Sequence, residues 1–127
     1  MKQGLREINE LVGTWGSLII NNQGNIIDIV IPPGLNKAAL ANITNHIVDL
    51  LLSAGEKVPG LTEALYHFTD RKIFILDLEQ VILVVICTPS IDISLLRMTV
   101  NVVVTNWKTD PKVQQQFQDL YVERAQK

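Results

Sequence analysis

The stretch from Ile73 to Pro89, IFILDLEQVILVVICTP, constrains the fold of this chain more than any other part of the sequence. Asp77 and Glu79 separate two aliphatic blocks. A membrane helix needs about twenty uninterrupted apolar residues, and each carboxylate near its middle would cost several kcal/mol. Each block has the length and the β-branched content of a strand, and residues 77–80 can carry a reversal. The stretch therefore predicts two adjacent strands of one antiparallel sheet, covered by helices on both faces.

Composition indicates one small domain that associates with other chains. The chain has 127 residues, of which 47% are hydrophobic and only 19% charged, with a mean hydropathy of +0.22. A domain of this size cannot hide so much aliphatic surface alone, so we expect an oligomer. The net charge of -2, without a block of lysines or arginines, argues against nucleic acid as a partner.

The N-terminal sequence and the single cysteine favour a cytoplasmic protein. MKQGLREINELVG places charged residues where a secretory signal is apolar. Cys87 cannot form an internal disulfide, and no Cys/His cluster is present to hold a metal. We expect no cofactor and no direct membrane insertion.

Before the apolar stretch, periodicity and turn residues predict a helix, a hairpin, a long helix and a strand. Two prolines and a glycine after the hairpin force a turn. In order, the expected elements are a helix over Leu5–Val12, strands over Trp15–Ile20 and Ile26–Ile31, a helix from the Asn36 cap to Ala54, and a strand over Leu61–Phe68.

After Pro89 the pattern is ambiguous. The Val and Thr content of residues 92–107 favours a strand. Leu95, Met98 or Thr99, and Val102 recur with a period near three and a half, which favours a helix, and we prefer the helix. Asp110-Pro111 begins a final helix. The prediction is an α+β fold with a single five-stranded antiparallel sheet, the long middle helix on one face and the N- and C-terminal helices on the other.

In this order of elements the chain resembles the roadblock/dynein light chain family, and within it the prokaryotic small-GTPase regulators. The resemblance lies in GSLIINNQGNIID (Gly16–Asp28), in LANITNHIVDLLLSAGE (Leu40–Glu56) and in KIFILDLEQVILVVI (Lys72–Ile86). It covers roughly Leu5 to Val104. We therefore expect a roadblock-like, profilin-like domain over residues 1–108 and a helical extension over residues 109–127.

The resemblance implies a homodimer, or a heterodimer with a roadblock paralogue, in which middle helices pack together and third strands pair edge to edge. The middle helix has apolar residues over half its circumference or more, a surplus that a partner would cover. By position, the expected dimer interface consists of Ala41, Val48, Leu52, Thr62, Ala64 and Tyr66.

No enzyme is visible in the sequence. His46 and His67 are the only candidate bases, and neither has a convincing neighbour for a catalytic triad. A turn explains Asp77 and Glu79 without chemistry, and Cys87 in a Val/Ile run is expected to be buried. No P-loop motif occurs, so the chain is not itself a GTPase.

The family resemblance implies a Ras-like small GTPase as partner, with this protein as an activating or exchange partner. The polar strip Asn42, Asn45 and Asp49 on the middle helix is the expected GTPase-facing surface. The chain has four arginines, Arg6, Arg71, Arg97 and Arg124. Arg71 and Arg97 are expected to be solvated or ion-paired, and no arginine finger is assigned. The alternatives are a structural scaffold or motor-associated light chain without effect on nucleotide turnover, and a small-molecule sensor.

Overall fold

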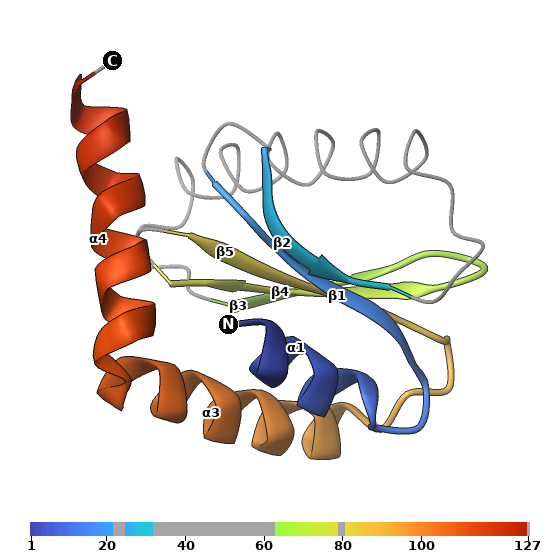
Figure 1. The fold of residues 1–127 in the computed structure, drawn as a ribbon. Helices are drawn as coiled ribbons and strands as arrows, with labels where there is room; N and C mark the ends of the chain where they lie inside the picture. The colour runs from blue at the N-terminus through green and yellow to red at the C-terminus, as the bar shows by residue number, and fades with distance from the viewer. Residues whose placement is uncertain (22–24, 32–62, 79–80, 127) are drawn as a thin grey trace.

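The protein, analysed as a computed structural model, is described over residues 1–21, 25–31, 63–78 and 81–126, with side chains up to Asp119. One five-stranded antiparallel sheet with the strand order β2-β1-β5-β4-β3 confirms the predicted α+β fold (Figure 1). The described elements are α1 (Lys2–Asn9), β1 (Thr14–Ile20), β2 (Ile26–Val30), β3 (Glu63–His67), β4 (Lys72–Asp77), β5 (Ile82–Cys87), α3 (Ile93–Thr109) and α4 (Pro111–Gln126).

The apolar stretch forms β4 and β5, which pair antiparallel as predicted. Their register runs from Lys72 opposite Cys87 to Asp77 opposite Ile82. At the reversal the Leu78 N–H donates to the Val81 carbonyl at 2.9 Å. Every residue of β5 is buried, because the strand lies between β1 and β4 and is covered on both faces.

Alternation along the strands builds two separate hydrophobic clusters, one on each face of the sheet. On one face, Phe74, Leu83 and Val85 pack with α1, α3 and α4. On the other face, Ile75 and Val84 belong to a second buried cluster. Figure 1 shows α1 and α3 together on the first face. The predicted middle helix over residues 36–54 lies outside the described residues.

A buried polar contact fastens α1 to the sheet. Ser17 on β1 is fully buried, and its Oγ lies 3.0 Å from the Leu5 carbonyl and 2.9 Å from Asn9 Oδ1. Asn9 Nδ2 also donates to the Val30 carbonyl at 2.8 Å. A single asparagine therefore connects α1 to both β1 and β2. The helix ends at Asn9, earlier than predicted, and Val12 is 91% exposed.

The prediction of a helix after Pro89 is confirmed, despite its β-branched content. Asp92 caps α3, since its carboxylate accepts the Leu95 N–H at 3.1 Å. The residues that set the helical period, however, lie away from the core: Leu95, Met98 and Val102 are 44%, 64% and 60% exposed. A second apolar row is the one that faces the sheet, namely Leu96, Val100, Val103, Val104 and Trp107.

The final helix begins at Pro111 as predicted, and Val113 and Phe117 of its first half pack in the cluster with α1 and α3. Figure 1 shows α4 turning away from the end of α3 and rising past the sheet. Phe117 packs edge to face on Trp107, with ring centroids 6.3 Å apart. Gln114 Nε2 donates to the Trp107 carbonyl at 2.7 Å. The assignment of residues 109–127 as a separate extension stays a prediction.

Substitution of Ser17 tests the α1 anchor. Ser17→Ala leaves the Leu5 carbonyl and the Asn9 amide oxygen without the buried donor, so the free energy of unfolding should fall by about 1–2 kcal/mol. The matched control Ser94→Ala, at an exposed position of α3, should change it by less than about 0.5 kcal/mol. Urea unfolding measures both, and equal effects would contradict the anchor.

Candidate interaction surfaces

The strand β3 forms one edge of the sheet. It pairs with β4 on one side, and no described strand pairs with it on the other. Its residues Glu63 to Tyr66 are half-buried and His67 is exposed, in contrast to the fully buried β5. An unpaired strand edge is a template for pairing with another chain.

The hydrogen-bond pattern shows which backbone groups of β3 face outward. At the hairpin, the Phe68 N–H donates to the Arg71 carbonyl at 2.8 Å. Residues of an antiparallel pair alternate between bonding and non-bonding positions, so Tyr66 and Ala64 also direct their N–H and C=O groups toward β4. The backbone groups of Leu65 and His67 therefore point away from the sheet.

The side chains of β3 divide between the two faces. Tyr66, and with it Ala64 two residues earlier, lies on the face of the second cluster. Leu65 packs on the opposite face. On that face Glu63 accepts a hydrogen bond from Arg97 of α3 at 2.6 Å. This ion pair joins β3 to α3, and as a solvent-exposed pair it contributes at most about 1 kcal/mol.

The opposite edge strand, β2, is partly occupied by α1. The Val30 carbonyl accepts the Asn9 amide, and Lys2 lies 3.6 Å from Asp28. Charged side chains and covering elements are the means by which sheet edges avoid pairing with other chains. Of the two edges, β3 therefore presents the better surface for strand pairing.

Of the residues expected at the dimer interface, the structure places Ala64 and Tyr66 on this edge strand. The remaining four, and the polar strip expected to face a GTPase, lie outside the described residues: Ala41, Val48, Leu52 and Thr62, and Asn42, Asn45 and Asp49. Their assignments stay predictions.

Two arginines occupy ion pairs, which confirms the role expected for them. Arg97 binds Glu63, and Arg71 binds Asp70 with 2.9 Å between Nη2 and Oδ2. The hydrogen bond from Arg71 lowers the pKa of the Asp70 carboxyl. Both guanidinium groups therefore bind carboxylates of this chain rather than pointing freely into solvent.

The described candidates for chemistry are scattered. His67 is exposed at the end of β3, whereas Cys87 is buried at the end of β5. His46 and Glu79 lie outside the described residues. Within the described ranges no group of three or more His, Cys, Asp or Glu side chains could hold a metal. Nor does any helix there combine the length and the apolar character needed to cross a bilayer.

The burial of the Cys87 thiol can be tested by measuring how the stability of the protein depends on pH. Burial raises the pKa of this thiol from 9.0 to about 11, so the folded protein holds the proton more tightly than the unfolded chain does. Stability should be intact below pH 9 and fall between pH 9 and 11, by on the order of 2 kcal/mol. Urea unfolding across this range should show a steeper loss for the wild type than for Cys87→Ala. Parallel losses would contradict the burial effect.

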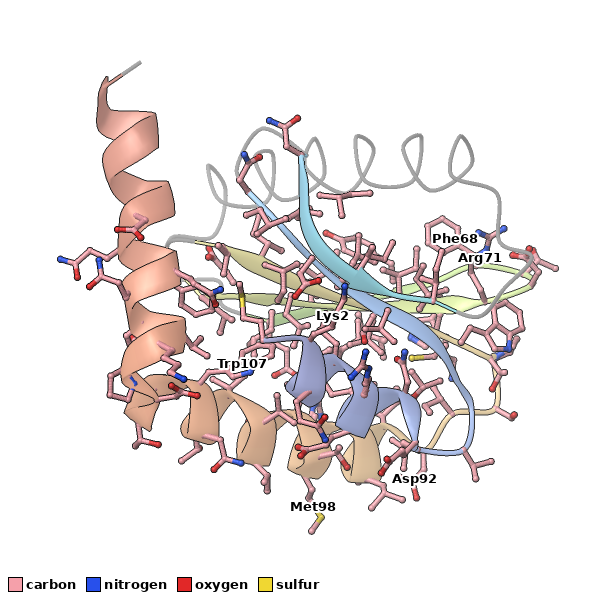
Figure 2. The ribbon with its side chains drawn as sticks, in the orientation of Figure 1. Lys2, Phe68, Arg71, Asp92, Met98 and Trp107 are labelled. Carbon is pink, nitrogen blue, oxygen red and sulfur yellow. The ribbon has the colours of Figure 1, made fainter. Side chains whose placement is uncertain are left out.

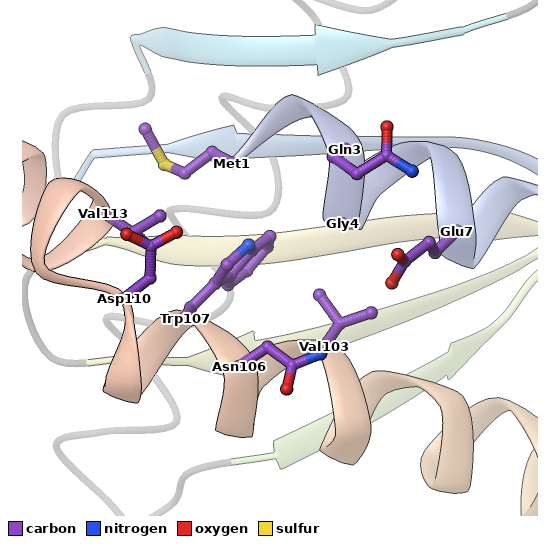
Figure 3. Close-up of a pocket in the computed structure, with 9 residues that line it drawn as sticks. All are labelled: Met1, Gln3, Gly4, Glu7, Val103, Asn106, Trp107, Asp110 and Val113. Atoms are coloured by element: carbon purple, nitrogen blue, oxygen red, sulfur yellow. The ribbon is translucent and has the colours of Figure 1, made fainter.

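A pocket of about 180 Å³ lies between α1, the second half of α3 and the start of α4 (Figure 3). Helices α1 and α3 approach closely because Gly4 has no side chain. A Cβ at this position would lie 2.6 Å from Val103 Cγ1 and 2.8 Å from the Trp107 ring. This pocket was not predicted from the sequence. A glycine on the apolar side of α1, one turn before Ile8, was the available signal.

The pocket has apolar walls and a polar rim. Its apolar lining comes from Met1, Val103, Trp107 and Val113, and its polar lining from Gln3, Glu7, Asn106 and Asp110. Figure 3 shows Glu7 on α1 and Asp110 at the α3–α4 junction on different sides of the indole of Trp107.

Solved structures establish the fold. A Roadblock/LC7 domain from Streptomyces avermitilis matches with a TM-score of 0.71 at 12% identity, over 85% of this chain and 94% of that one. The gliding protein MglB from Thermus thermophilus matches with 0.69 at 12% identity, over 80% and 81%. MglC from Myxococcus xanthus matches with 0.61 at 15% identity, over 91% and 97%.

No protein-family model matches the sequence, and no curated protein matches it. At identities this low the likeness is one of fold. The chain has the roadblock fold, as the resemblance in its sequence implied.

Proposed function

We propose that this chain is a non-enzymatic roadblock module that dimerises and serves as a regulator of, or platform for, a Ras-like small GTPase. The observation that carries the proposal is the half-exposed edge strand β3 on a roadblock fold. The likeness in fold to MglB and MglC agrees with the roadblock resemblance of the sequence, and it is this resemblance that implies a regulatory role. The protein would act through what it binds.

Dimerisation follows from the outward backbone groups of β3. A second copy placed antiparallel on this edge would bond to Leu65 and His67 and extend the sheet from one protomer into the next. Ala64 and Tyr66 would then lie next to the partner strand. One solved MglB structure with a TM-score of 0.66 is described as a tetrameric arrangement, which supports self-association as a property of this fold.

The substitution His67→Pro tests whether the edge of β3 pairs with a second copy. His67→Pro removes an outward N–H from an exposed residue and leaves the bonds between β3 and β4 in place. By two-fold symmetry each copy loses one hydrogen bond of about 1 kcal/mol, so the dimer dissociation constant should rise at least tenfold. Analytical ultracentrifugation over micromolar concentrations measures this constant.

The matched control is His67→Ala, which loses the same imidazole but keeps the N–H. It should dissociate like the wild type. Equal constants for the proline and alanine variants would remove β3 from the interface. A wild type that sediments as a single chain at micromolar concentration would refute the dimer.

The GTPase-facing surface is proposed on the polar strip of the middle helix. Because Arg71 and Arg97 are engaged in ion pairs, the proposal assigns them no part in hydrolysis. Regulation would act instead by holding or reshaping the switch segments of the GTPase.

The double variant Asn45→Arg and Asp49→Arg tests this surface. With a purified small GTPase from the same genome, loaded with a non-hydrolysable GTP analogue, calorimetry should show at least a tenfold loss of affinity, because two long cations replace a neutral and an acidic group. Glu10→Arg, at the exposed residue that follows α1, serves as control and should bind like the wild type. Intact binding by the double variant would move the site elsewhere.

Nucleotide turnover separates the two candidate roles. A change in the rate of GTP hydrolysis or nucleotide release on adding this protein would support a regulator. Binding with unchanged rates would support the scaffold instead.

A further inference from the structure

The exposed side of α3 carries an apolar row that nothing in the described structure covers. We call Leu95, Met98 and Val102 the outer stripe. At 3.6 residues per turn these three lie within an arc of roughly 60°. All three are more than 40% exposed, and Figure 2 shows Met98 pointing away from the sheet. The core needs none of them, because the opposite row of α3 fills the space below the sheet.

The outer stripe leads directly to the pocket between α1, α3 and α4. Asn106 is the next position of the same row, four residues after Val102, and it lines the pocket. The line from Leu95 to Asn106 is about 16 Å long at 1.5 Å per residue. The stripe and the pocket thus form one continuous surface.

No cation of the described chain pairs with the two carboxylates of the pocket, and the one contact of the Asp110 carboxylate is the Lys112 N–H at 2.9 Å. Glu7 is half-buried, yet its carboxylate takes part in none of the ion pairs or hydrogen bonds there, and Asp110 is in no ion pair. Trp107 is only 5% exposed, and its indole N–H donates to no acceptor. No lysine, arginine or histidine lines the pocket. Two carboxylates beside an aromatic ring favour a cation whose stem is apolar.

We propose that the outer stripe and this pocket form a docking site for an amphipathic helix of another protein, whose apolar side chains cover the stripe and whose arginine or lysine enters the pocket. A helix is the matching shape, because residues spaced i, i+3 and i+7 form a ridge that packs against the groove of another helix. The surface of α3 offers no backbone edge to an extended strand. A volume of about 180 Å³ suits one basic side chain.

A second copy of this chain fits the surface poorly. Two α3 helices packed antiparallel through their outer stripes would bring Asp92 of one copy toward the pocket of the other. Packed parallel, they would bring the two acidic pockets together. Both arrangements add negative charge where the pocket already has two carboxylates, so charge selects a different partner.

The probe is a synthetic alanine-rich helix with three leucines spaced i, i+3 and i+7 and an arginine one turn beyond them at each end. Its neutral match carries citrulline in place of both arginines. The indole signal of Trp107 in a ¹⁵N spectrum reports binding, and Trp15→Phe identifies that signal because the chain has two tryptophans. The arginine peptide should shift the signal and bind at least fivefold more tightly than the citrulline peptide.

Glu7→Gln should remove the preference for arginine and leave citrulline binding unchanged. Glu10→Gln, at the residue that follows the same helix and outside the pocket, should keep the preference. Met98→Gln should weaken both peptides. The same spectra confirm that each variant is folded.

Three results would overturn the proposal: no shift at millimolar peptide, equal binding of the two peptides, or a preference that survives Glu7→Gln. A fourth would be a lower solution mass for Met98→Gln than for the wild type, which would make the stripe a contact between copies. The proposal does not depend on the GTPase, and the His67 variants leave this surface unchanged.

Discussion

The burial of β5 on both faces is the constraint on which the rest of the structure depends. A strand with every residue buried must have a neighbour on each side and a covering layer on each face. This requirement places β1 and β4 beside it and moves β2 and β3 to the edges. It also demands α1 and α3 below the sheet, where Leu83, Val85 and Cys87 point. With its centre closed in this way, the described part of the sheet is open to partners at its edges rather than at its central strand.

The sequence predicts an element of this fold well where its apolar pattern allows only one interpretation, and poorly where the pattern allows two. The strands followed from β-branched runs bounded by turn residues, and Asp77 ruled out a membrane helix. In α3, by contrast, two apolar rows share one helix. Periodicity identifies a helix, but it cannot say whether Leu95 and Met98 or Val100 and Val103 face the sheet. Only the position of α1 decides between them.

The pocket was beyond sequence reasoning for a related reason. It results from the approach of α1 to α3 at Gly4 and from the direction in which α4 leaves α3. The contact joins residues about a hundred positions apart, and the direction is fixed by the packing of Phe117 and Gln114 on Trp107, which no periodic pattern signals. Figure 2 shows Trp107 near this junction, beside the N-terminal helix that carries Lys2. A glycine and a tryptophan so distant in sequence give no periodic signal.

The two proposed surfaces differ in the kind of partner that physics allows them. Strand pairing at β3 uses backbone groups, which are the same in every copy, so it suits two identical chains. The surface on α3 is acidic at the pocket, where Glu7 and Asp110 lie. Such a surface repels its own copy and selects a complementary chain. Because Glu63 of β3 bonds Arg97 of α3, the two surfaces meet at one ion pair.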